Sequence, residues 1–291
     1  MVKIKNAWLR GGFMSEKIKG DLIIIGGAED KKGDKEILKI VCDSIDKKKD
    51  TILIATIATE YPKEAFVKYS KVFKELGVNN IKGLNIEKRK DSFDEYNINL
   101  VKEASLIFFT GGDQLRITSL IGGTLINEAL KDAIENGCIM VGTSAGASVM
   151  SDTMIVMGPD EESPRKCTLR MAPGLGFVKG IMIDQHFAQR GRIGRLLAGI
   201  AQNPEVLGIG IDEDTAIVVK DTGEAEVIGN GAVYFLDARD IIYNNVSEQN
   251  FDEVLSMFNV KLHILKEGNR FNLLTKLPFE EENQQNENNR D

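Results

Sequence analysis

The chain has 291 residues, of which 42% are hydrophobic and 28% are charged, and its formal net charge at pH 7 is −7. This length and hydrophobic content favour one extended α/β domain with a large core, and the negative charge argues against nucleic acid as a partner. The three cysteines lack metal-ligand spacing, no apolar run has membrane-spanning length and no signal-peptide core is found. We therefore expect a soluble, cytoplasmic protein without a metal ion or a membrane partner.

The two ends of the chain differ in composition from the rest. Residues 1–13 are basic and patternless, and Met14-Ser-Glu-Lys is typical of an ordinary start, so we expect a disordered N-terminal extension. Residues 280–291 are acidic and rich in asparagine and glutamine, which predicts a disordered tail. Residues 14–279 are then expected to form a single α/β domain.

Strand and helix patterns alternate through the first half of the chain. A short apolar strand at Leu22–Ile25 precedes a helix with an apolar face from Ile37 to Val41. A strand at Thr51–Ala55 and a helix beginning at Pro62 follow, and the pattern repeats at residues 81–84, 94–103 and 106–109. This alternation predicts a mostly parallel sheet with helices on both faces.

Glycine pairs follow two of these predicted strands, at Gly26–Gly27 and Gly111–Gly112. Because ligands bind beyond the carboxyl ends of parallel strands, we expect both loops to border the functional site; tight turns without a site role are the alternative. Neither loop has a Walker or G-x-G-x-x-G pattern, so no nucleotide cofactor is predicted.

Ser144 lies at the centre of a Gly-Thr-Ser-Ala-Gly sequence, between an apolar run at residues 138–141 and small, helix-compatible residues. This context is typical of a nucleophile elbow, a sharp turn that presents the serine hydroxyl above the sheet. The N–H groups of Ala145 and of the Gly111–Gly112 loop are then candidate donors to an oxyanion. The alternative is an ordinary strand–helix loop with a capping serine.

The sequence offers two histidines as the base that a serine nucleophile needs. His263 alternates with apolar residues in a late strand, which favours a structural role. His186 follows the apolar run Ile181–Ile183, so we expect it at a strand end, as the general base. An acid that orients the base could be Asp212, Glu213 or Asp214, and spacing alone does not choose among them.

Charged residues surround His186 in the sequence: Asp184, Arg190, Arg192 and Arg195. A helix over residues 192–201 turns Ile193, Leu196, Leu197 and Ile200 inward and leaves arginines at its start, beside the predicted base. Arginine binds carboxylates bidentately, so a substrate rich in carboxylate is expected, and Glu29, Asp113 or Asp184 could hold a cationic group. A solvated basic helix start is the alternative.

The C-terminal part is expected to add small elements to the parallel core. Asn230–Gly231 predicts a hairpin between strands at residues 224–228 and 232–236. Phe251, Val254, Leu255 and Phe258 have helical spacing, and residues 271–274 could pair with residues 261–265.

Four motifs in this order resemble the cyanophycinase family of serine peptidases, which includes dipeptidase E. They are Phe-Thr-Gly-Gly-Asp-Gln at 109–114, Gly-Thr-Ser-Ala-Gly-Ala at 142–147, Asp-Gln-His-Phe-x-x-Arg-x-Arg-x-x-Arg at 184–195 and Gly-Ile-Asp-Glu-Asp-Thr-Ala at 210–216. The resemblance implies a flavodoxin-like, class I glutamine amidotransferase-like fold and a homodimer without a cofactor. It also implies that Ser144 is the nucleophile, His186 the base and Glu213 the orienting acid, with Gly112 and Ala145 at the oxyanion. The implied substrate-binding residues are Gln114, Asp184, Gln185, Arg190, Arg192 and Arg195.

The activity that this resemblance implies is exopeptidase cleavage of cyanophycin, a poly-aspartate whose side-chain carboxyls carry arginine, to β-aspartyl-arginine dipeptides. An aspartyl dipeptidase acting on small peptides is one alternative. A non-catalytic binding protein on the same fold is another, but it would be expected to have lost a triad residue. A glutaminase is disfavoured because that chemistry places cysteine at the elbow.

Overall fold

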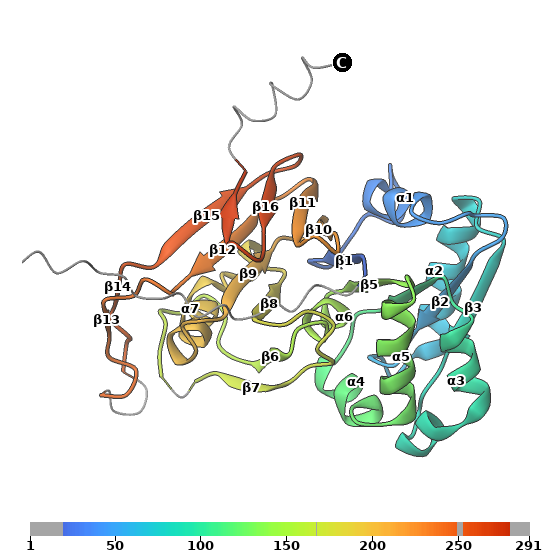
Figure 1. Ribbon diagram of the computed structural model, residues 1–291, viewed down its shortest axis with the longest axis horizontal. Coiled ribbons are helices and arrows are strands. Elements are labelled where there is room, and N and C mark those ends of the chain that lie inside the picture. The colour runs from blue at the N-terminus through green and yellow to red at the C-terminus, as the bar shows by residue number, and fades with distance from the viewer. Residues whose placement is uncertain (1–19, 167, 249–252, 280–291) are drawn as a thin grey trace, which may run out of the picture.

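The structure is a computed structural model that describes residues 20–166, 168–248 and 253–279. Its first half forms a layered α/β body, and its second half is mostly β (Figure 1). The predicted extension at residues 1–13 and tail at 280–291 lie outside the described residues. Within the described part, none of the helices combines the length and the apolar character needed to cross a bilayer.

The described residues form a nine-stranded main sheet in the order β17-β16-β11-β10-β1-β5-β4-β2-β3. Five neighbouring strands are parallel: β1 (Leu22–Ile25), β5 (Ile139–Thr143), β4 (Leu106–Phe109), β2 (Thr51–Ala55) and β3 (Asn80–Leu84). The other four extend the sheet antiparallel from β1: β10 (Thr215–Val219), β11 (Glu224–Gly229), β16 (Arg270–Asn272) and β17 (Leu277–Pro278).

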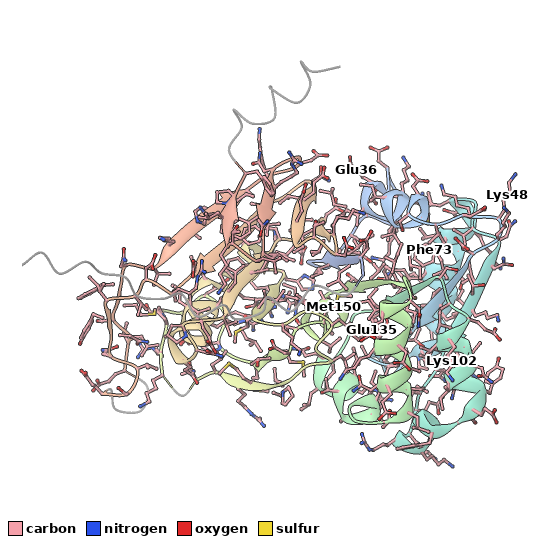
Figure 2. All side chains as sticks on the ribbon, in the orientation of Figure 1. Glu36, Lys48, Phe73, Lys102, Glu135 and Met150 are labelled. Carbon is pink, nitrogen blue, oxygen red and sulfur yellow. The ribbon has the colours of Figure 1, made fainter. Side chains whose placement is uncertain are left out.

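Helices cover both faces of the parallel strands, as the alternating pattern predicts. Alternate β1 side chains belong to different cores: Ile23 and Ile25 pack with α1 (Glu36–Asp43) and α2 (Pro62–Glu75), and Leu22 and Ile24 pack with the opposite layer. The opposite layer contains α3 (Glu95–Lys102), α4 (Gln114–Ile121) and α5 (Leu125–Glu135), with the 3-10 turn η1 (Arg89–Phe93) beside them. Phe73, labelled in Figure 2, joins α2 to the sheet through an edge-to-face contact with Phe108 of β4.

A second sheet has the order β15-β12-β9-β8. Its strands are β8 (Ile181–Gln185), β9 (Leu207–Ile211), β12 (Val233–Asp237) and β15 (Lys261–Leu265), with β8 and β9 parallel. Helix α7 (Ile193–Gln202) packs Leu196 and Ile200 against Gly208 of β9. Stacked rings of Phe235 in β12 and Phe271 in β16, with centroids 4.0 Å apart, join the two sheets.

Short elements complete the described chain. They are the helix α6 (Ala145–Ser148), the 3-10 turn η2 (Ala188–Arg190) and two strand pairs, β6 (Thr153–Met157) with β7 (Arg170–Pro173) and β13 (Tyr243–Asn244) with β14 (Met257–Phe258).

The expected hairpin at Asn230–Gly231 is wrong. β11 pairs with β10 and β16 in the main sheet, whereas β12 pairs with β9 and β15 in the second sheet. The Asn-Gly sequence does turn the chain, but the turn carries it from one sheet to the other. Local turn residues specify a reversal, whereas the strand that fills the neighbouring position is chosen by tertiary packing.

Two further expectations for the C-terminal part are also wrong. Phe251 lies outside the described residues, and where the predicted helix would end, Met257 and Phe258 form strand β14 instead. The expected pairing of residues 271–274 with 261–265 does not occur, because β15 pairs with β12 and β16 pairs with β11 and β17. Helical spacing over eight residues is a weak signal that pairing with a neighbouring strand overrides.

Candidate active site

Ser144 occupies a sharp turn between β5 and α6. Its backbone angles, φ 54° and ψ −115°, are unfavourable for a residue with a side chain. A Cβ on Gly142 would lie 2.2 Å from the carbonyl oxygen of Gly146, and a Cβ on Gly146 would lie 2.3 Å from that of Phe109. Both glycines of the elbow sequence are therefore required by close backbone contacts.

His186 follows β8 and reaches Ser144 from the second sheet. Its Nε2 lies 2.9 Å from Ser144 Oγ, and its Nδ1 lies 2.6 Å from Oε1 of Glu213. With the proton on Nδ1 donated to Glu213, Nε2 is free to accept the serine hydroxyl proton. The arrangement is that of a serine nucleophile with an oriented general base.

Burial lowers the pKa of His186, and the positive charge of Arg190 lowers it further, while the hydrogen bond to Glu213 raises it. Burial is the largest of these effects, so the imidazole is neutral at pH 7. A neutral imidazole is the form that can take a proton from Ser144.

The three acidic residues that spacing could not separate have different partners. Glu213 binds His186, whereas Asp212 accepts the backbone N–H groups of Ala188 and Ala232. Asp214 accepts the N–H of Asp30 and the side-chain amide of Asn230. Glu213 is thus the acid in contact with the imidazole, and its two neighbours hold the loops around it.

From the strand-end positions of Ser144 and His186, we expected the three side chains of the hydrogen-bond chain to meet at the edge of one sheet. They come instead from two sheets. Ser144 follows β5 of the main sheet and His186 follows β8 of the second. Glu213 lies in the connection from β9 of the second sheet to β10 of the main one. The candidate site is therefore assembled where the two sheets adjoin.

The predicted oxyanion residues belong to two chain segments that adjoin Ser144. Ala145 begins α6 directly after it. The loop with Gly111 and Gly112 also adjoins it, because a Cβ on Gly111 would be 3.3 Å from Ser144 Cβ. Gly112 has φ +147°, and a Cβ there would lie 2.3 Å from the carbonyl oxygen of Ala58.

Two of the three predicted arginines are buried in ion pairs. Arg195 binds Asp184 with its Nε, at 2.6 Å, and with a second guanidinium nitrogen, and it also contacts Asp160. Arg192 donates to Asp160, at 2.9 Å, and to the backbone oxygen of Gln185. The two arginines at the helix start, Arg192 and Arg195, are therefore buried and paired within the protein, whereas Arg190 is exposed.

The remaining predicted binding residues also have protein partners. The Gln185 side-chain oxygen lies 3.4 Å from Ser144 Oγ and 3.1 Å from Arg192, and Gln114 donates to the backbone of Ile155. Asp113 caps α4. Asp184 and Glu29, the other candidates for holding a cation, are occupied by Arg195 and by Lys31, Tyr69 and Thr143.

His263, the second histidine, lies in edge strand β15 with its ring 5.7 Å from that of Phe271.

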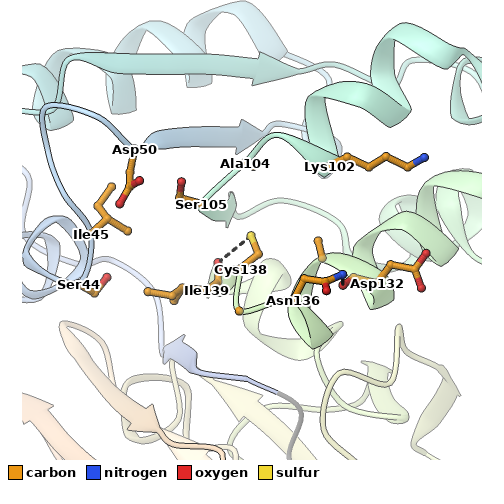
Figure 3. A pocket seen from close by; sticks show the side chains of 12 residues that line it. Ser44, Ile45, Asp50, Lys102, Ala104, Ser105, Asp132, Asn136, Cys138 and Ile139 are labelled. Carbon is orange, nitrogen blue, oxygen red and sulfur yellow. Dashed lines mark hydrogen bonds between the residues drawn. The ribbon is translucent and has the colours of Figure 1, made fainter.

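A cleft of about 590 Å³ lies at the amino ends of β4 and β5, where it includes Ser105, Cys138 and Ile139 (Figure 3). Ser144 is at the carboxyl end of β5, so this cleft is separate from the candidate site. Among the described residues, no group of three or more His, Cys, Asp or Glu side chains could hold a metal ion.

Sequence reasoning did not identify the contacts that Gly27, Thr143 and Tyr69 make around the triad. Gly27, which we expected only to border it, has φ +104°, and a Cβ there would lie 2.4 Å from Cε1 of His186. Thr143 and Tyr69 bind the buried carboxylate of Glu29. The glycine pair was a visible signal, but nothing local marks Thr143 or Tyr69, because their shared partner is far away in the sequence.

Comparison with known proteins gives a consistent result. The family model of peptidase family S51 matches residues 22–227. A cyanophycinase from Geminocystis herdmanii is 37% identical over 267 residues, covering 91% of this chain and 98% of the relative. A cyanophycinase from Trichormus variabilis is 36% identical over 253 residues, covering 87% and 85%. The crystal structure of a peptidase from an acI-B1 Actinobacterium has the same fold, with a TM-score of 0.63 at 22% identity, covering 87% of this chain and 96% of that one.

Proposed function

The chain belongs to peptidase family S51, and from that premise we propose that it is a serine exopeptidase that degrades cyanophycin to β-aspartyl-arginine dipeptides. The observation that carries the chemistry is the continuous hydrogen-bond chain from Ser144 through His186 to Glu213. The similarity to cyanophycinases over nearly the whole chain supports the substrate.

In the proposed mechanism, Ser144 Oγ attacks a backbone carbonyl of the polymer while His186 Nε2 takes the hydroxyl proton. Glu213 stabilises the imidazolium that forms and keeps the ring in its working orientation. His186 then gives the proton to the leaving amine, and an acyl-enzyme remains on Ser144. Water, activated by the same imidazole, hydrolyses the ester and restores the serine.

The oxyanion of each tetrahedral intermediate is held by the N–H groups of Gly112 and Ala145. This assignment is supported by the positions of the two loops beside Ser144 and by the start of α6 at Ala145. Fixed N–H donors stabilise the charge that develops in the transition state, and they need no reorganisation during the reaction.

The polymer unit presents both carboxylates and guanidinium groups. Arg190, the exposed arginine beside His186, is the proposed contact for a substrate carboxylate. The Gln185 side-chain oxygen, 3.4 Å from Ser144 Oγ, is a second proposed contact for the substrate. The proposed role of Arg192, Arg195, Asp184 and Gln114 is to hold the chain around the substrate through their protein contacts.

The experiment that tests this proposal follows dipeptide release from purified cyanophycin by mass spectrometry. We expect β-aspartyl-arginine from the wild-type protein and a loss of at least about 10³-fold in Ser144→Ala. Aspartyl dipeptides are assayed in parallel. Faster cleavage of these small peptides than of the polymer would replace the proposed substrate, and undiminished release by Ser144→Ala would overturn the mechanism.

We also propose that the protein is a cytoplasmic homodimer. Buried Cys42 and Cys138 are free thiols whose pKa burial raises to about 12, in keeping with a reducing compartment. Strand β15 exposes the apolar side chains of Leu262 and Ile264 on one face, which supports packing of this face against a second copy. Light scattering on the purified chain tests the dimer.

A further inference from the structure

The carboxylate of Glu29 is buried near the nucleophile elbow, and the proposed mechanism does not use it. Its side chain is 1% exposed, although charged carboxylates are costly to bury unless they are fully paired. Oε1 accepts the Tyr69 hydroxyl at 2.6 Å and lies 2.7 Å from Lys31 Nζ. Oε2 accepts the Thr143 hydroxyl at 2.6 Å.

Thr143 is the last residue of β5 and directly precedes Ser144. Its side chain therefore fixes the start of the strained turn that presents the nucleophile. Glu29 also lies beside Lys31 Nζ, and hydrogen bonds accepted by ion-paired carboxylates are stronger than those between neutral groups. The Ser144 N–H donates to Ile25 O at 3.1 Å, which provides a second tie to the same chain segment.

Residues 25–30, the segment that contains Glu29, also hold the other two members of the proposed triad. The N–H of His186 donates to Gly26 O at 2.8 Å, and the N–H of Asp214, next to Glu213, donates to Gly27 O at 2.9 Å. The N–H of Asp30 donates to the Asp214 side chain. This one segment thus contacts the chain at or beside Ser144, His186 and Glu213, which come from separate elements of two sheets.

From these contacts we propose that Glu29 is a positioning residue, which acts through Thr143 to align Ser144 Oγ with His186. This role rests on the proposed serine-peptidase function. The side-chain hydrogen bonds of Glu29 go to neither Ser144 nor His186, so Glu29 acts by fixing the position of the Ser144 hydroxyl relative to the His186 ring. Misplacing a nucleophile by a fraction of an ångström lowers the rate of chemistry with little effect on binding.

The test compares Thr143→Val, which removes the hydroxyl at nearly constant volume, with Thr143→Ser, which keeps it. We expect kcat to fall at least about tenfold in Thr143→Val and KM to change less than about threefold, whereas Thr143→Ser retains kcat within about threefold. Glu29→Gln should reproduce the loss in kcat. Thr124→Val, in the connection between α4 and α5, is the matched control, because it removes a buried threonine hydroxyl that donates to the backbone oxygen of Ile121 and not to Glu29; its kcat should stay within about threefold.

A second readout is independent of the polymer: the rate at which a fluorophosphonate labels Ser144, measured on variants shown to be folded by thermal unfolding. We expect Thr143→Val and Glu29→Gln to label at least about tenfold more slowly than the wild type. Equal labelling of Thr143→Val and wild type would overturn the positioning role alone. A wild-type protein that is not labelled would overturn the serine-peptidase function and, with it, this role. If Thr143→Val does not fold, Glu29→Gln decides in the same way.

Discussion

Ser144 and His186 both have positive φ, 54° and 48°, in a region that side chains rarely occupy. Such backbone conformations persist only where the surroundings determine them completely. Here the surroundings are close backbone contacts and glycines: Gly142 and Gly146 beside Ser144, and Gly27 under the His186 ring. At the scale of single residues, the site depends as much on absent side chains as on the three that react.

Gly27→Ala should therefore inactivate the protein. The new Cβ would lie 2.4 Å from Cε1 of His186 and would displace the imidazole from Ser144. We expect kcat/KM to fall at least about 10²-fold, measured by dipeptide release. The control is Gly123→Ala, which also introduces a side chain at positive φ, +66°, but has no atom within 4 Å of the new Cβ. Equal activity of the two variants would contradict this role of Gly27.

The pH dependence follows from the lowered pKa of His186. Since the neutral imidazole is the working form, activity should be present at neutral pH and be lost as the pH falls through a pKa below 6.5. Arg190→Gln removes a charge that lowers this pKa, so the acidic limb should move to higher pH. Arg190→Lys, which keeps the charge, should leave the limb in place. The pH profile of fluorophosphonate labelling measures this without involving substrate contacts, and an unmoved limb in Arg190→Gln argues against the electrostatic coupling.

At the scale of elements, buried charge joins β8 to α7. Asp184 is the fourth residue of β8, Arg195 lies in the first turn of α7, and both are nearly inaccessible to solvent. Their bidentate contact satisfies both groups where water cannot. It fixes the helix against the strand that ends at His186, so the pair sets the position of the proposed base.

Asp184→Asn should destabilise the fold strongly, because it removes the buried anionic partner of the Arg195 guanidinium and leaves only the partly exposed Asp160, at 3.3 Å. We expect a loss of about 3–5 kcal/mol in the free energy of unfolding, measured by urea denaturation. Glu103→Gln breaks the exposed pair between Lys82 and Glu103, and should cost less than about 1 kcal/mol. Similar losses in the two variants would show that burial does not decide the contribution of these pairs.

At the scale of the whole molecule, the two sheets share one hydrophobic core. Phe235 of the second sheet and Phe271 of the main sheet stack with an interplanar angle of 8°, and both belong to the cluster that also contains β1 and β5 side chains. Because the proposed triad takes residues from both sheets, the reactive geometry exists only while they remain docked.

Phe271→Ala should lower the free energy of unfolding by about 3–5 kcal/mol. Phe93→Ala, which truncates a half-exposed ring on η1, should cost less than about 1 kcal/mol.

In the wild type, the loss of far-UV circular dichroism and the loss of Ser144 labelling should coincide along a urea gradient, because the core shared by the two sheets unfolds cooperatively. Loss of labelling well before the loss of secondary structure would show instead that the sheets separate first.

The sequence by itself determined the strand–helix order of the parallel core, the position of Ser144 in a strand–helix turn and the choice of His186 over His263. These features are local: a period of two or 3.6 residues, a glycine beside a serine, and a histidine after an apolar run are each legible within about ten residues. The family resemblance identified Glu213 as the acid that orients His186, because the residue pattern alone did not distinguish it from Asp212 and Asp214.

The tertiary structure decided the features that depend on partners distant in the chain. It separated Glu213 from its neighbours, placed β11 and β12 in different sheets, and buried Arg192 and Arg195 against Asp160 and Asp184. It also joined Glu29 to Thr143, 114 positions apart. The free energy of such contacts comes from burial and pairing in three dimensions, and no periodicity in the sequence records which residues will meet.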